Sequence, residues 1–535
     1  MAFIILPIHL FAPEIFLEAI KPIQTEIKTF YLLEEPVYFG DHKTHLNFNK
    51  IKLIYHHASL QYYLDLFNTK IKTKINSSPL EYIEYSKLSK TTASSPGFTA
   101  IKKHSKVFMF DPVDTYLEAK YKAIFKSKLQ PFLETPLFLT SNEQLSDYHK
   151  TKKNKDSYFH ASFYTWQRER LDILSHSKTY DTENRNMMPL DTKVPSLPSN
   201  DSSTSNTRKY IQDAITYIER LFPDNLEPIY KQTKTKPITP ESVLFPITHD
   251  TTRKWVINFC EKRLSQFGKF EDSIDSVPRN VLFHSAITPM LNIGLITPHQ
   301  IVTIITDYYN KHKAAIGIAN YEGFIRQIIG WREYQRYIYR YAGDTMRASN
   351  HFQNNRTLTK HWYSATTGIK PVDDAITLAL NDGYIHHILR LMVVGNMMNL
   401  VGIHPNEVYK WFMEFALDSY DWVMVGNVYS MALWADGGLT MRKPYISGDG
   451  YIMKMSNYKK LSSKNRLEEN NGLTWNEKWN AIFHSFIDRN GVKLSKTYYA
   501  GLVKAWNKKP LDERNQEMQI AKDIINTITG GLKSI

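Results

Sequence analysis

The chain has 535 residues, of which 42% are apolar and 22% charged, proportions that exclude a wholly disordered, collagen-like or coiled-coil protein. Its 67 Lys and Arg against 53 Asp and Glu give a formal net charge of +14. This charge favours a polyanionic partner, with nucleic acid first and an anionic membrane surface second.

The first 145 residues alternate β-type runs with helical patterns. Strands are predicted at Phe3–Leu6, Phe30–Leu33, Ile51–Tyr55 and Lys106–Phe110, and helices at Ala58–Phe67 and Tyr116–Lys128. This alternation predicts an α/β domain with a mainly parallel, Rossmann-like sheet over residues 1–145. Met1–Leu10 is apolar but lacks a basic segment and a small-residue cleavage site. We therefore expect no secretion signal and an intracellular protein.

Residues 146–210 become polar, and Ser196–Thr207 (SLPSNDSSTSNT) has almost nothing to bury, so we expect a partly flexible connector. Residues 211–535 carry helical patterns and no repeat of 20 to 50 residues, which predicts one large all-α domain rather than a solenoid. The helices are expected at Ile211–Leu221, Thr252–Gln266, Pro298–Tyr309, Tyr321–Tyr341, Val372–Asn381, Tyr384–Val401 and Asn406–Leu417.

Cys260 is the single cysteine, so this chain cannot form an intrachain disulfide or an all-cysteine iron–sulfur cage. The apolar stretch Tyr384–Ile403 contains two histidines, an arginine and two asparagines. Such groups are costly in lipid. We therefore interpret this stretch as a core helix that faces a polar ligand, not as a membrane span.

Aromatic and cationic residues interleave at helical spacing between Tyr321 and Arg340. Spacings of four residues let arginine side chains share one helix face, which suits phosphate, although a solvated basic face is an equally good alternative. Trp331 favours nucleic acid, because an indole beside arginines commonly stacks on bases. The arginines are Arg326, Arg332, Arg336 and Arg340.

Two further windows point to a polar pocket. His386 and His387 are adjacent on the predicted helix and point about 100° apart, so one of them is expected to face a pocket as a proton donor. A lone histidine there would more often be a satisfied core group. Carboxylates among buried-type residues need partners, and Arg390 is a plausible one. These carboxylates are Asp418, Asp421 and Asp436.

A series of motifs in the second domain carries a family resemblance. In chain order they are FPIT, RLSQFGKFEDSI, LFHSAITPMLNIGLITP, GFIRQIIGWREY, HHILRLMVVGN, DSYDWVMVGN, WADGG and KPYISGDGYIMKMS. Together they resemble the photolyase/cryptochrome superfamily, specifically its iron–sulfur bacterial branch, the prokaryotic (6-4) photolyases, which are related to deoxyribodipyrimidine photolyase. In the first domain only FYTWQRER, YDTENR and the strand order support the resemblance.

The resemblance implies an antenna-type α/β domain joined to a helical domain that binds FAD in a U shape and receives a flipped DNA lesion. It implies light-driven repair by electron transfer from reduced flavin to ultraviolet-damaged DNA, by a monomer, with the (6-4) photoproduct as the favoured lesion. A cyclobutane pyrimidine dimer photolyase of the same fold and a cryptochrome-like blue-light photoreceptor without repair stay open as alternatives.

The resemblance also implies roles for single residues. Ser285 and Thr288 would lie at the FAD phosphates, Arg390 and Asp418 beside the isoalloxazine, and Asn427 in the same flavin-contacting segment. On the lesion side, the resemblance implies a histidine that delivers a proton in (6-4) repair, two tyrosines at the lesion and three residues that line the opening. These are His387, then Tyr445 and Tyr451, then Gln327, Trp331 and Arg332.

The chain departs from the family at several positions. Residues other than cysteine stand where the branch has its four cluster cysteines, so we expect no iron–sulfur cluster, with Trp475 and Trp479 filling the volume. Met424 replaces a glutamate near the flavin. For photoreduction, Trp411 matches the aromatic nearest FAD and Tyr363 the outer position, but Phe412 interrupts the route unless Trp362 or Tyr409 carries the electron. The cluster positions are Pro371, Lys459, Ser462 and Glu477.

The antenna site also differs. Leu6–Phe11 (LPIHLF) replaces the Gly-Asp-Gln turn that helps hold 6,7-dimethyl-8-ribityllumazine in the family. Glu34 and Glu35 are candidates for a ribityl pocket, but a surface position explains them equally well. The presence of an antenna chromophore therefore stays open.

Overall fold

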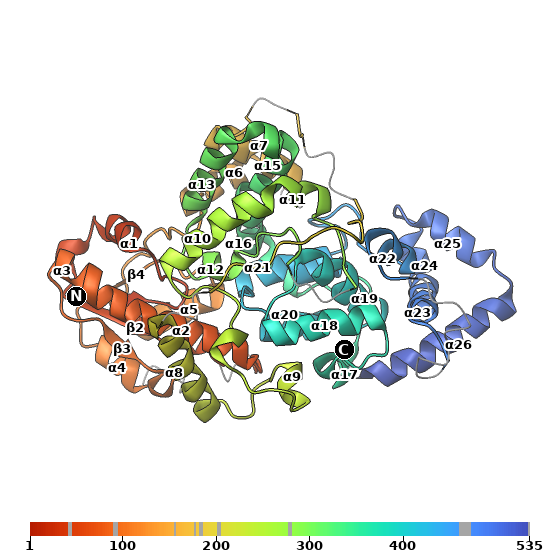
Figure 1. Cartoon of the computed structure of the whole chain (residues 1–535), viewed down its shortest axis with the longest axis horizontal. Helices are drawn as coiled ribbons and strands as arrows, with labels where there is room; N and C mark the ends of the chain where they lie inside the picture. The colour runs from red at the N-terminus through yellow and green to blue at the C-terminus, as the bar shows by residue number, and fades with distance from the viewer. Residues whose placement is uncertain are drawn as a thin grey trace.

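The computed structural model describes residues 1–40, 45–88, 95–152, 154, 157–175, 178–180, 186–200, 205–276, 281–459 and 472–532. The N-terminal strands and their helices form one end of the molecule, at the left of Figure 1. The later helices continue from this end to an arm formed by α25 and α26 on the opposite side. The predicted division into an α/β part followed by a helical part is therefore confirmed.

The N-terminal sheet is parallel, in the order β3-β2-β1-β4. Its strands are β1 (Ala2–Ile5), β2 (Thr29–Leu33), β3 (Glu81–Ile83) and β4 (Val107–Met109). In the central strand, Phe3 lies opposite Phe30 on one side and Phe108 on the other. Since β1 is buried along its whole length, it reads as a continuous apolar run rather than an alternating one.

One predicted strand is wrong. Ile51–Tyr55 lies inside helix α2 (Lys50–Leu66), whose N-terminus is capped by Asn49: its side-chain oxygen accepts a hydrogen bond from the Ile51 N–H at 2.8 Å. The helix is buried almost all round, so its apolar residues show no helical period, and a short buried run cannot be assigned by periodicity. The strand missed was β3, a three-residue edge strand.

The remaining helices of the first 200 residues flank the sheet or lead out of it. They are α1 (Pro13–Ile20), α3 (Lys72–Ile75), α4 (Pro96–Ile101), α5 (Thr115–Phe125), α6 (Asn142–Thr151) and α7 (His160–Leu171). Because α6 and α7 lie within residues 146–210 or overlap them, the connector carries ordered helices. The boundaries at residues 145 and 210 stay a prediction, and residues 201–204 of the polar segment lie outside the described residues.

The second part is helical, with a small antiparallel pair formed by β5 (Arg356–Leu358) and β6 (Thr529–Leu532). Its helices up to residue 347 are α8 (Ser205–Leu221), α9 (Ile229–Gln232), α10 (His249–Lys262), α11 (Leu264–Phe270), α12 (Thr288–Asn292), α13 (Pro298–Lys311), α14 (Lys313–Ile316), α15 (Ile318–Ile325) and α16 (Glu333–Arg347). Beyond it lie α17 (His361–Ser364), α18 (Lys370–Asp382), α19 (Asn396–Leu400), α20 (Pro405–Phe415), α21 (Asp421–Val425), α22 (Asp449–Met455), α23 (Trp475–Arg489), α24 (Gly491–Leu494), α25 (Ala500–Asn507) and α26 (Leu511–Ile528).

Two long predicted helices are interrupted. The pattern from Tyr321 to Tyr341 is split by the π-helical segment η7 (Arg326–Arg332) between α15 and α16. The pattern from Tyr384 to Val401 contains a second π-helical segment, η8 (Leu389–Gly395), and its first three residues are not helical. His386 therefore precedes the helix, and the predicted helical angle between the two histidines does not apply.

Two of the four arginines predicted to share a phosphate-binding face, Arg336 and Arg340 of α16, are engaged by carboxylates. Arg336 Nη2 lies 3.2 Å from Asp111 Oδ2, and Arg340 forms an ion pair with Glu118. Both carboxylates belong to the N-terminal domain, so these two cations fasten the domains together.

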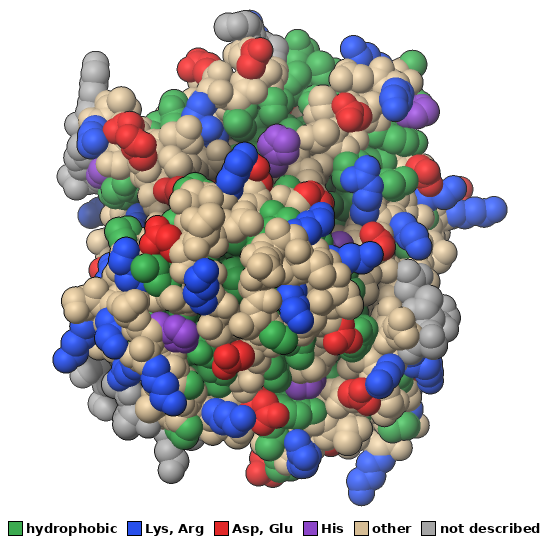
Figure 2. Space-filling view, turned by 90° about the vertical axis from the view of Figure 1, so that its left-hand side faces the viewer, with side chains coloured by type: hydrophobic (Ala, Val, Ile, Leu, Met, Phe, Trp, Pro, Cys, Tyr) green, Lys and Arg blue, Asp and Glu red, His purple; other side chains and the backbone are tan. Residues whose placement is uncertain are grey.

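On the end of the molecule shown in Figure 2, Lys and Arg are spread among Asp and Glu rather than gathered in one patch.

In the described part of the chain, no helix is both long enough and apolar enough to cross a membrane.

A buried imidazole at the domain interface makes stability depend on pH. His56 on α2 is 1% exposed, packs against Tyr420, and neither of its ring nitrogens has a hydrogen-bond partner among the described residues. Burial, with the nearby Lys52 charge as a smaller cause, lowers the pKa of His56 from 6.5 to about 3. Below pH 6.5 the unfolded chain therefore binds a proton at this residue that the folded chain does not bind.

We predict that His56→Leu makes the free energy of unfolding less sensitive to acid. Between about pH 8 and about pH 5, His56 should lower the stability of the parent protein by about 2 kcal/mol, and the variant should not show this loss. Urea unfolding at the two pH values measures the difference. Tyr55→Phe is the control and should change stability equally at both pH values, because it removes a neighbouring buried hydroxyl that has no hydrogen-bond partner in the described part of the chain. Equal pH sensitivity of His56→Leu and the parent would contradict the prediction.

Candidate functional site

A cavity of about 630 Å³ opens in the helical part of the molecule, within the usual size range of cofactor pockets. It collects nearly all the residues that the sequence singled out, from segments far apart in the chain. The predicted residues on its wall are Ser285, Thr288, Gln327, Trp331, Arg332, His387, Arg390, Asp418, Asn427, Tyr445 and Tyr451. Trp411 and Tyr363 are the predicted site residues that do not line it.

Three π-helical segments form much of the wall: η7, η8 and η9 (Gly426–Ala432). A π-turn inserts one residue into a helix, so it re-aims the side chains that follow and is frequent at functional sites. Close packing accompanies two of these segments. A Cβ at Gly395 would lie 2.6 Å from the Arg390 carbonyl oxygen, and one at Gly426 would lie 1.9 Å from Gln335 Oε1. The backbone contact at Gly395 therefore requires glycine, whereas a Cβ at Gly426 would displace the end of the Gln335 side chain.

A largely buried ion pair lies in the cavity wall. Arg390 Nη1 lies 2.9 Å from Asp418 Oδ1, and Nη2 donates to Oδ2 at 3.1 Å. The Thr288 hydroxyl donates to the same Oδ2 at 2.6 Å, and Asn292 Nδ2 donates to the Asp418 carbonyl oxygen at 2.8 Å. The carboxylate thus joins η8 to α12. The Thr288 hydroxyl therefore positions Asp418, and its predicted contact with the FAD phosphates stays a prediction.

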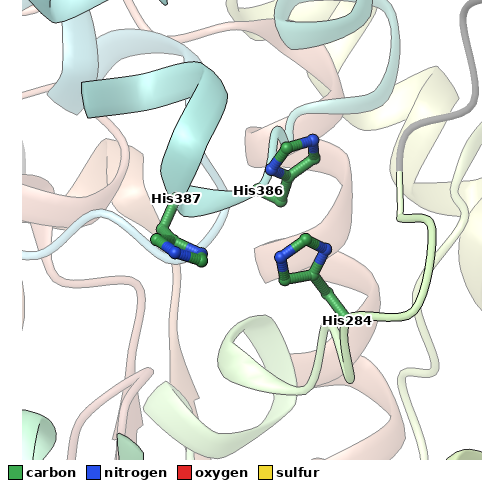
Figure 3. A group of neighbouring side chains, drawn as sticks. All are labelled: His284, His386 and His387. Carbon is green, nitrogen blue, oxygen red and sulfur yellow. The ribbon is translucent and has the colours of Figure 1, made fainter. Parts of the chain in front are cut away.

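Three histidines form a cluster at one side of the cavity (Figure 3). The rings of His284 and His386 are stacked, with centroids 4.5 Å apart and planes at 12°. Both nitrogens of His284 face backbone carbonyl oxygens, of Val281 at 2.9 Å and Glu271 at 2.8 Å. Parallel rings direct their in-plane lone pairs side by side rather than to one point, so this geometry does not suit a shared metal ion.

The electrostatics of the cluster single out His387. Burial is the main cause that lowers the pKa of His284 to about 4 and that of His386 well below its usual value, so both are neutral near pH 7. The His387 side chain is 47% exposed, and its Nε2 lies 3.6 Å from Asp272 Oδ1. His284 and His387 both line the cavity, and His387 is the exposed one of the two, with the Asp272 carboxylate beside it on the same wall.

The wall beside η7 is anchored by an aromatic stack. Trp331 packs face to face on His160 of α7, with centroids 3.8 Å apart and planes at 11°. Arg332 is 8% exposed, donates to Asn292 and the Leu137 carbonyl oxygen, and lies over the Trp422 ring. Burial lowers its pKa to about 9. This position suits a contact with a ligand inside the cavity better than the predicted contact with DNA.

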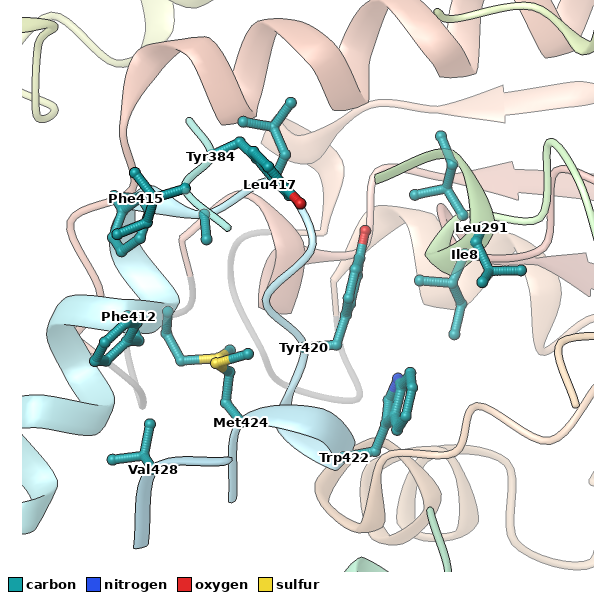
Figure 4. Close-up of a cluster of buried hydrophobic side chains, with 14 of the residues drawn as sticks. Ile8, Leu291, Tyr384, Phe412, Phe415, Leu417, Tyr420, Trp422, Met424 and Val428 are labelled. Atoms are coloured by element: carbon teal, nitrogen blue, oxygen red, sulfur yellow. The ribbon is translucent and has the colours of Figure 1, made fainter. Parts of the chain in front are cut away.

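An apolar patch forms another part of the cavity wall. Phe412, Met424 and Val428 lie together in Figure 4, and all three line the cavity. Phe412, not Trp411, is therefore the aromatic of this pair that borders the cavity. The Trp411 ring lies behind it, with centroids 5.1 Å apart, and its indole N–H donates to the Trp362 carbonyl oxygen at 2.9 Å. Tyr363 lies further out and donates to Glu414 Oε2 at 2.9 Å.

The positions aligned with cluster cysteines serve local structure where they are described. Glu477 accepts hydrogen bonds from the Thr474 N–H in the capping box of α23, and Pro371 occupies the first turn of α18. Trp475 and Trp479 are fully buried and pack edge to face, and the Trp475 N–H donates to the Lys459 carbonyl oxygen at 3.3 Å. Ser462 lies outside the described residues.

Glu34 and Glu35 are fully buried, so the surface alternative for these carboxylates is wrong. Each accepts several hydrogen bonds from protein donors, which already engage all four oxygens. The donors to Glu34 are His57, Tyr82, Tyr217 and the Tyr85 N–H, and those to Glu35 are Lys120, Tyr121 and the Val37 N–H.

Some wall residues escaped the sequence analysis. Gln335, Asp272, Lys443 and Tyr499 line the cavity, but they lie outside the predicted roles. Tyr499 carried no signal, because its segment follows the last motif; Asp272 and Lys443 lie within quoted motifs. Gln335 Oε1 and Arg332 Nε have no hydrogen-bond partner among the described residues. Orphaned polar atoms on a wall that also has apolar parts fit a polar ligand such as a nucleotide cofactor.

The sequence matches two family models, described as "Deoxyribodipyrimidine photo-lyase-related protein" over residues 3–229 and "FAD binding domain of DNA photolyase" over residues 322–446. A (6-4) photolyase of Agrobacterium fabrum is 31% identical over 371 residues, which cover 68% of each chain. An uncharacterised protein of Acanthamoeba polyphaga mimivirus, R855, is 52% identical over 103 residues, 19% of this chain and 75% of that protein. The solved structure of a Synechocystis cryptochrome shares the fold, with a TM-score of 0.55, 11% identity and 98% coverage of both chains.

We predict that breaking the Arg390–Asp418 pair is more damaging than removing it. Asp418→Ala leaves a buried guanidinium without its counter-charge and should lower the free energy of unfolding by about 3–5 kcal/mol. The double variant Arg390→Met/Asp418→Leu should recover most of this loss. Urea unfolding measures both, and a single variant that loses less than about 1 kcal/mol would contradict a structural role for the pair.

Proposed function

Because this chain belongs to the photolyase/cryptochrome superfamily, we propose that it is a light-driven DNA photolyase that binds FAD and acts on ultraviolet-induced pyrimidine photoproducts, the (6-4) photoproduct in preference. The observation that carries this proposal is that the predicted cofactor residues and the predicted lesion residues line one and the same cavity. The (6-4) photolyase of Agrobacterium fabrum, at 31% identity, supports the choice of lesion.

The cavity residues divide into two groups. Arg390, Asp418, Ser285 and Asn427 would hold FAD, which supplies the light-driven electron transfer when bound. The ion pair fixes a guanidinium and a carboxylate in one orientation, so a polar ring meets donors and acceptors that need no rearrangement. Thr288 and Asn292 act through Asp418 as positioning residues.

The second group serves the lesion. His387 would donate a proton from its imidazole, and the Asp272 carboxylate, whose Oδ1 lies 3.6 Å from Nε2, would orient the ring. The neutral His284 and His386 behind it place no competing charge there. Tyr445, Tyr451, Gln327 and Trp331 would pack around an everted nucleotide pair, and the energetic cost of eversion is only a few kcal/mol for a damaged, weakly stacked step.

The apolar patch is also compatible with a second substrate, the cyclobutane pyrimidine dimer. Met424 is 3% exposed and lies beside Phe412, so the wall carries a thioether at this position and not a carboxylic acid. A cyclobutane dimer needs no proton delivered to a departing hydroxyl, and such a wall therefore suits it as well. A cryptochrome-like photoreceptor would bind the flavin and repair neither lesion.

A lesion-resolved assay tests the proposed function. The purified protein, with FAD and a reductant, is illuminated with blue light together with oligonucleotides that carry either lesion. We expect light-dependent restoration of the (6-4) lesion. Restoration of the cyclobutane dimer alone would replace the lesion assignment, and failure on both with FAD bound would favour the photoreceptor.

We predict that His387→Asn lowers the rate of (6-4) repair by about 10²–10⁴-fold, the usual contribution of a general acid. FAD content and affinity for the lesion should stay close to those of the parent protein, because His387 lies in neither the ion pair nor its hydrogen-bond network. Single-turnover repair under continuous light measures the rate. Repair at the parental rate would remove the proposed proton donor.

A further inference from the structure

An exposed tyrosine stands at the edge of the cavity without a role in the site described above. Tyr498 precedes α25 and is 81% exposed, which with Val492 makes it one of the two most exposed large apolar side chains of the described residues. An aromatic ring that stays in solvent does not gain the favourable free energy of burying its apolar surface. Such a position suggests that something outside the chain covers the ring.

The backbone and neighbouring contacts place Tyr498 at the rim. The next residue, Tyr499, lines the cavity, and its hydroxyl donates to the carbonyl oxygens of Pro444 at 2.9 Å and Ile446 at 3.1 Å. These two carbonyls flank Tyr445 in the sequence, so α25 is fastened to the lesion-side segment. Lys443, also on the cavity wall, lies with its Nζ 4.9 Å from the centre of the Tyr498 ring.

The charge of this segment suits a polyanion. Residues 490–510 contain five lysines and no Asp or Glu. Lys509 pairs with Glu517, and Lys493 donates to the His351 carbonyl oxygen. The others, Lys496, Lys504 and Lys508, are exposed, as is Lys443. A solvent-facing aromatic ring among cations is the arrangement by which proteins hold unpaired nucleic acid strands.

We propose that Tyr498 and Lys443 form a rim contact for the DNA strand next to the everted lesion, an inference that rests on the proposed function. The Tyr498 ring stacks on the base that flanks the lesion, and Lys443 pairs with an adjacent phosphate. The contact would hold open the gap that eversion leaves in the duplex, and it would not touch the lesion itself.

The test compares a long and a short substrate. Tyr498→Ala should raise the Kd for a duplex with one (6-4) lesion by about tenfold or more, because stacking on a base is lost, whereas Tyr498→Phe should bind like the parent. Binding and repair of the isolated lesion dinucleotide, which has no flanking base, should be unchanged in both. Leu511→Ala, an exposed apolar residue at the start of α26, is the matched control and should leave both Kd values unchanged.

Two further measurements sharpen the result. Lys443→Gln should reduce the salt dependence of duplex binding by about one counterion. A 2-aminopurine beside the lesion should be quenched by the parent and by Tyr498→Phe but brighter with Tyr498→Ala. An unchanged duplex Kd for Tyr498→Ala, or an equal loss on the dinucleotide, would overturn the rim contact.

Failure of the proposed function gives a different pattern. If the parent protein repairs neither lesion, the contact is tested on undamaged single-stranded DNA in the dark. Tyr498→Ala should still weaken that binding relative to Tyr498→Phe, and equal affinities would overturn the inference independently of repair.

Discussion

The Arg390–Asp418 pair is the interaction on which the site depends. Two charges removed from water must stay matched, so this pair fixes the relative positions of η8, of the loop before α21 and, through Thr288 and Asn292, of α12. Every one of these segments contributes residues to the cavity. The pair therefore determines where these wall segments meet.

The helices around the pair are built to aim side chains inward. Each of the segments η7, η8 and η9 inserts a π-turn where it borders the cavity, and glycines at 395 and 426 allow the close approaches that follow. The domain interface supports this arrangement from outside. Arg336 binds Asp111, and His160 of the connector stacks on Trp331, so the N-terminal part of the chain braces the cavity wall.

The sequence predicted the fold class and the residues of the cavity better than it predicted their local geometry. Arg390, Asp418 and His387 lie in motifs that follow one another in the family's order through the second domain. This order made the family recognisable, and the comparisons confirm the family. The sequence pattern gave no indication of the π-turns, because the insertion of a residue into a helix depends on tertiary packing. The residue spacing predicted that Arg336 and Arg340 share a helix face, but it could not show that this face packs against carboxylates of the N-terminal part. Ile51–Tyr55 was predicted as a strand because α2 is buried almost all round and its apolar residues therefore show no helical period.

The proposed repair requires that one cavity bring bound flavin and an everted lesion into contact. The fluorescence lifetime of the light-excited, fully reduced holoprotein tests it directly. We expect a marked shortening of the lifetime when a saturating (6-4) lesion dinucleotide is added, and none with the undamaged dinucleotide. A lifetime that does not change while the lesion is bound would rule out this arrangement, since the electron would then have no acceptor within reach.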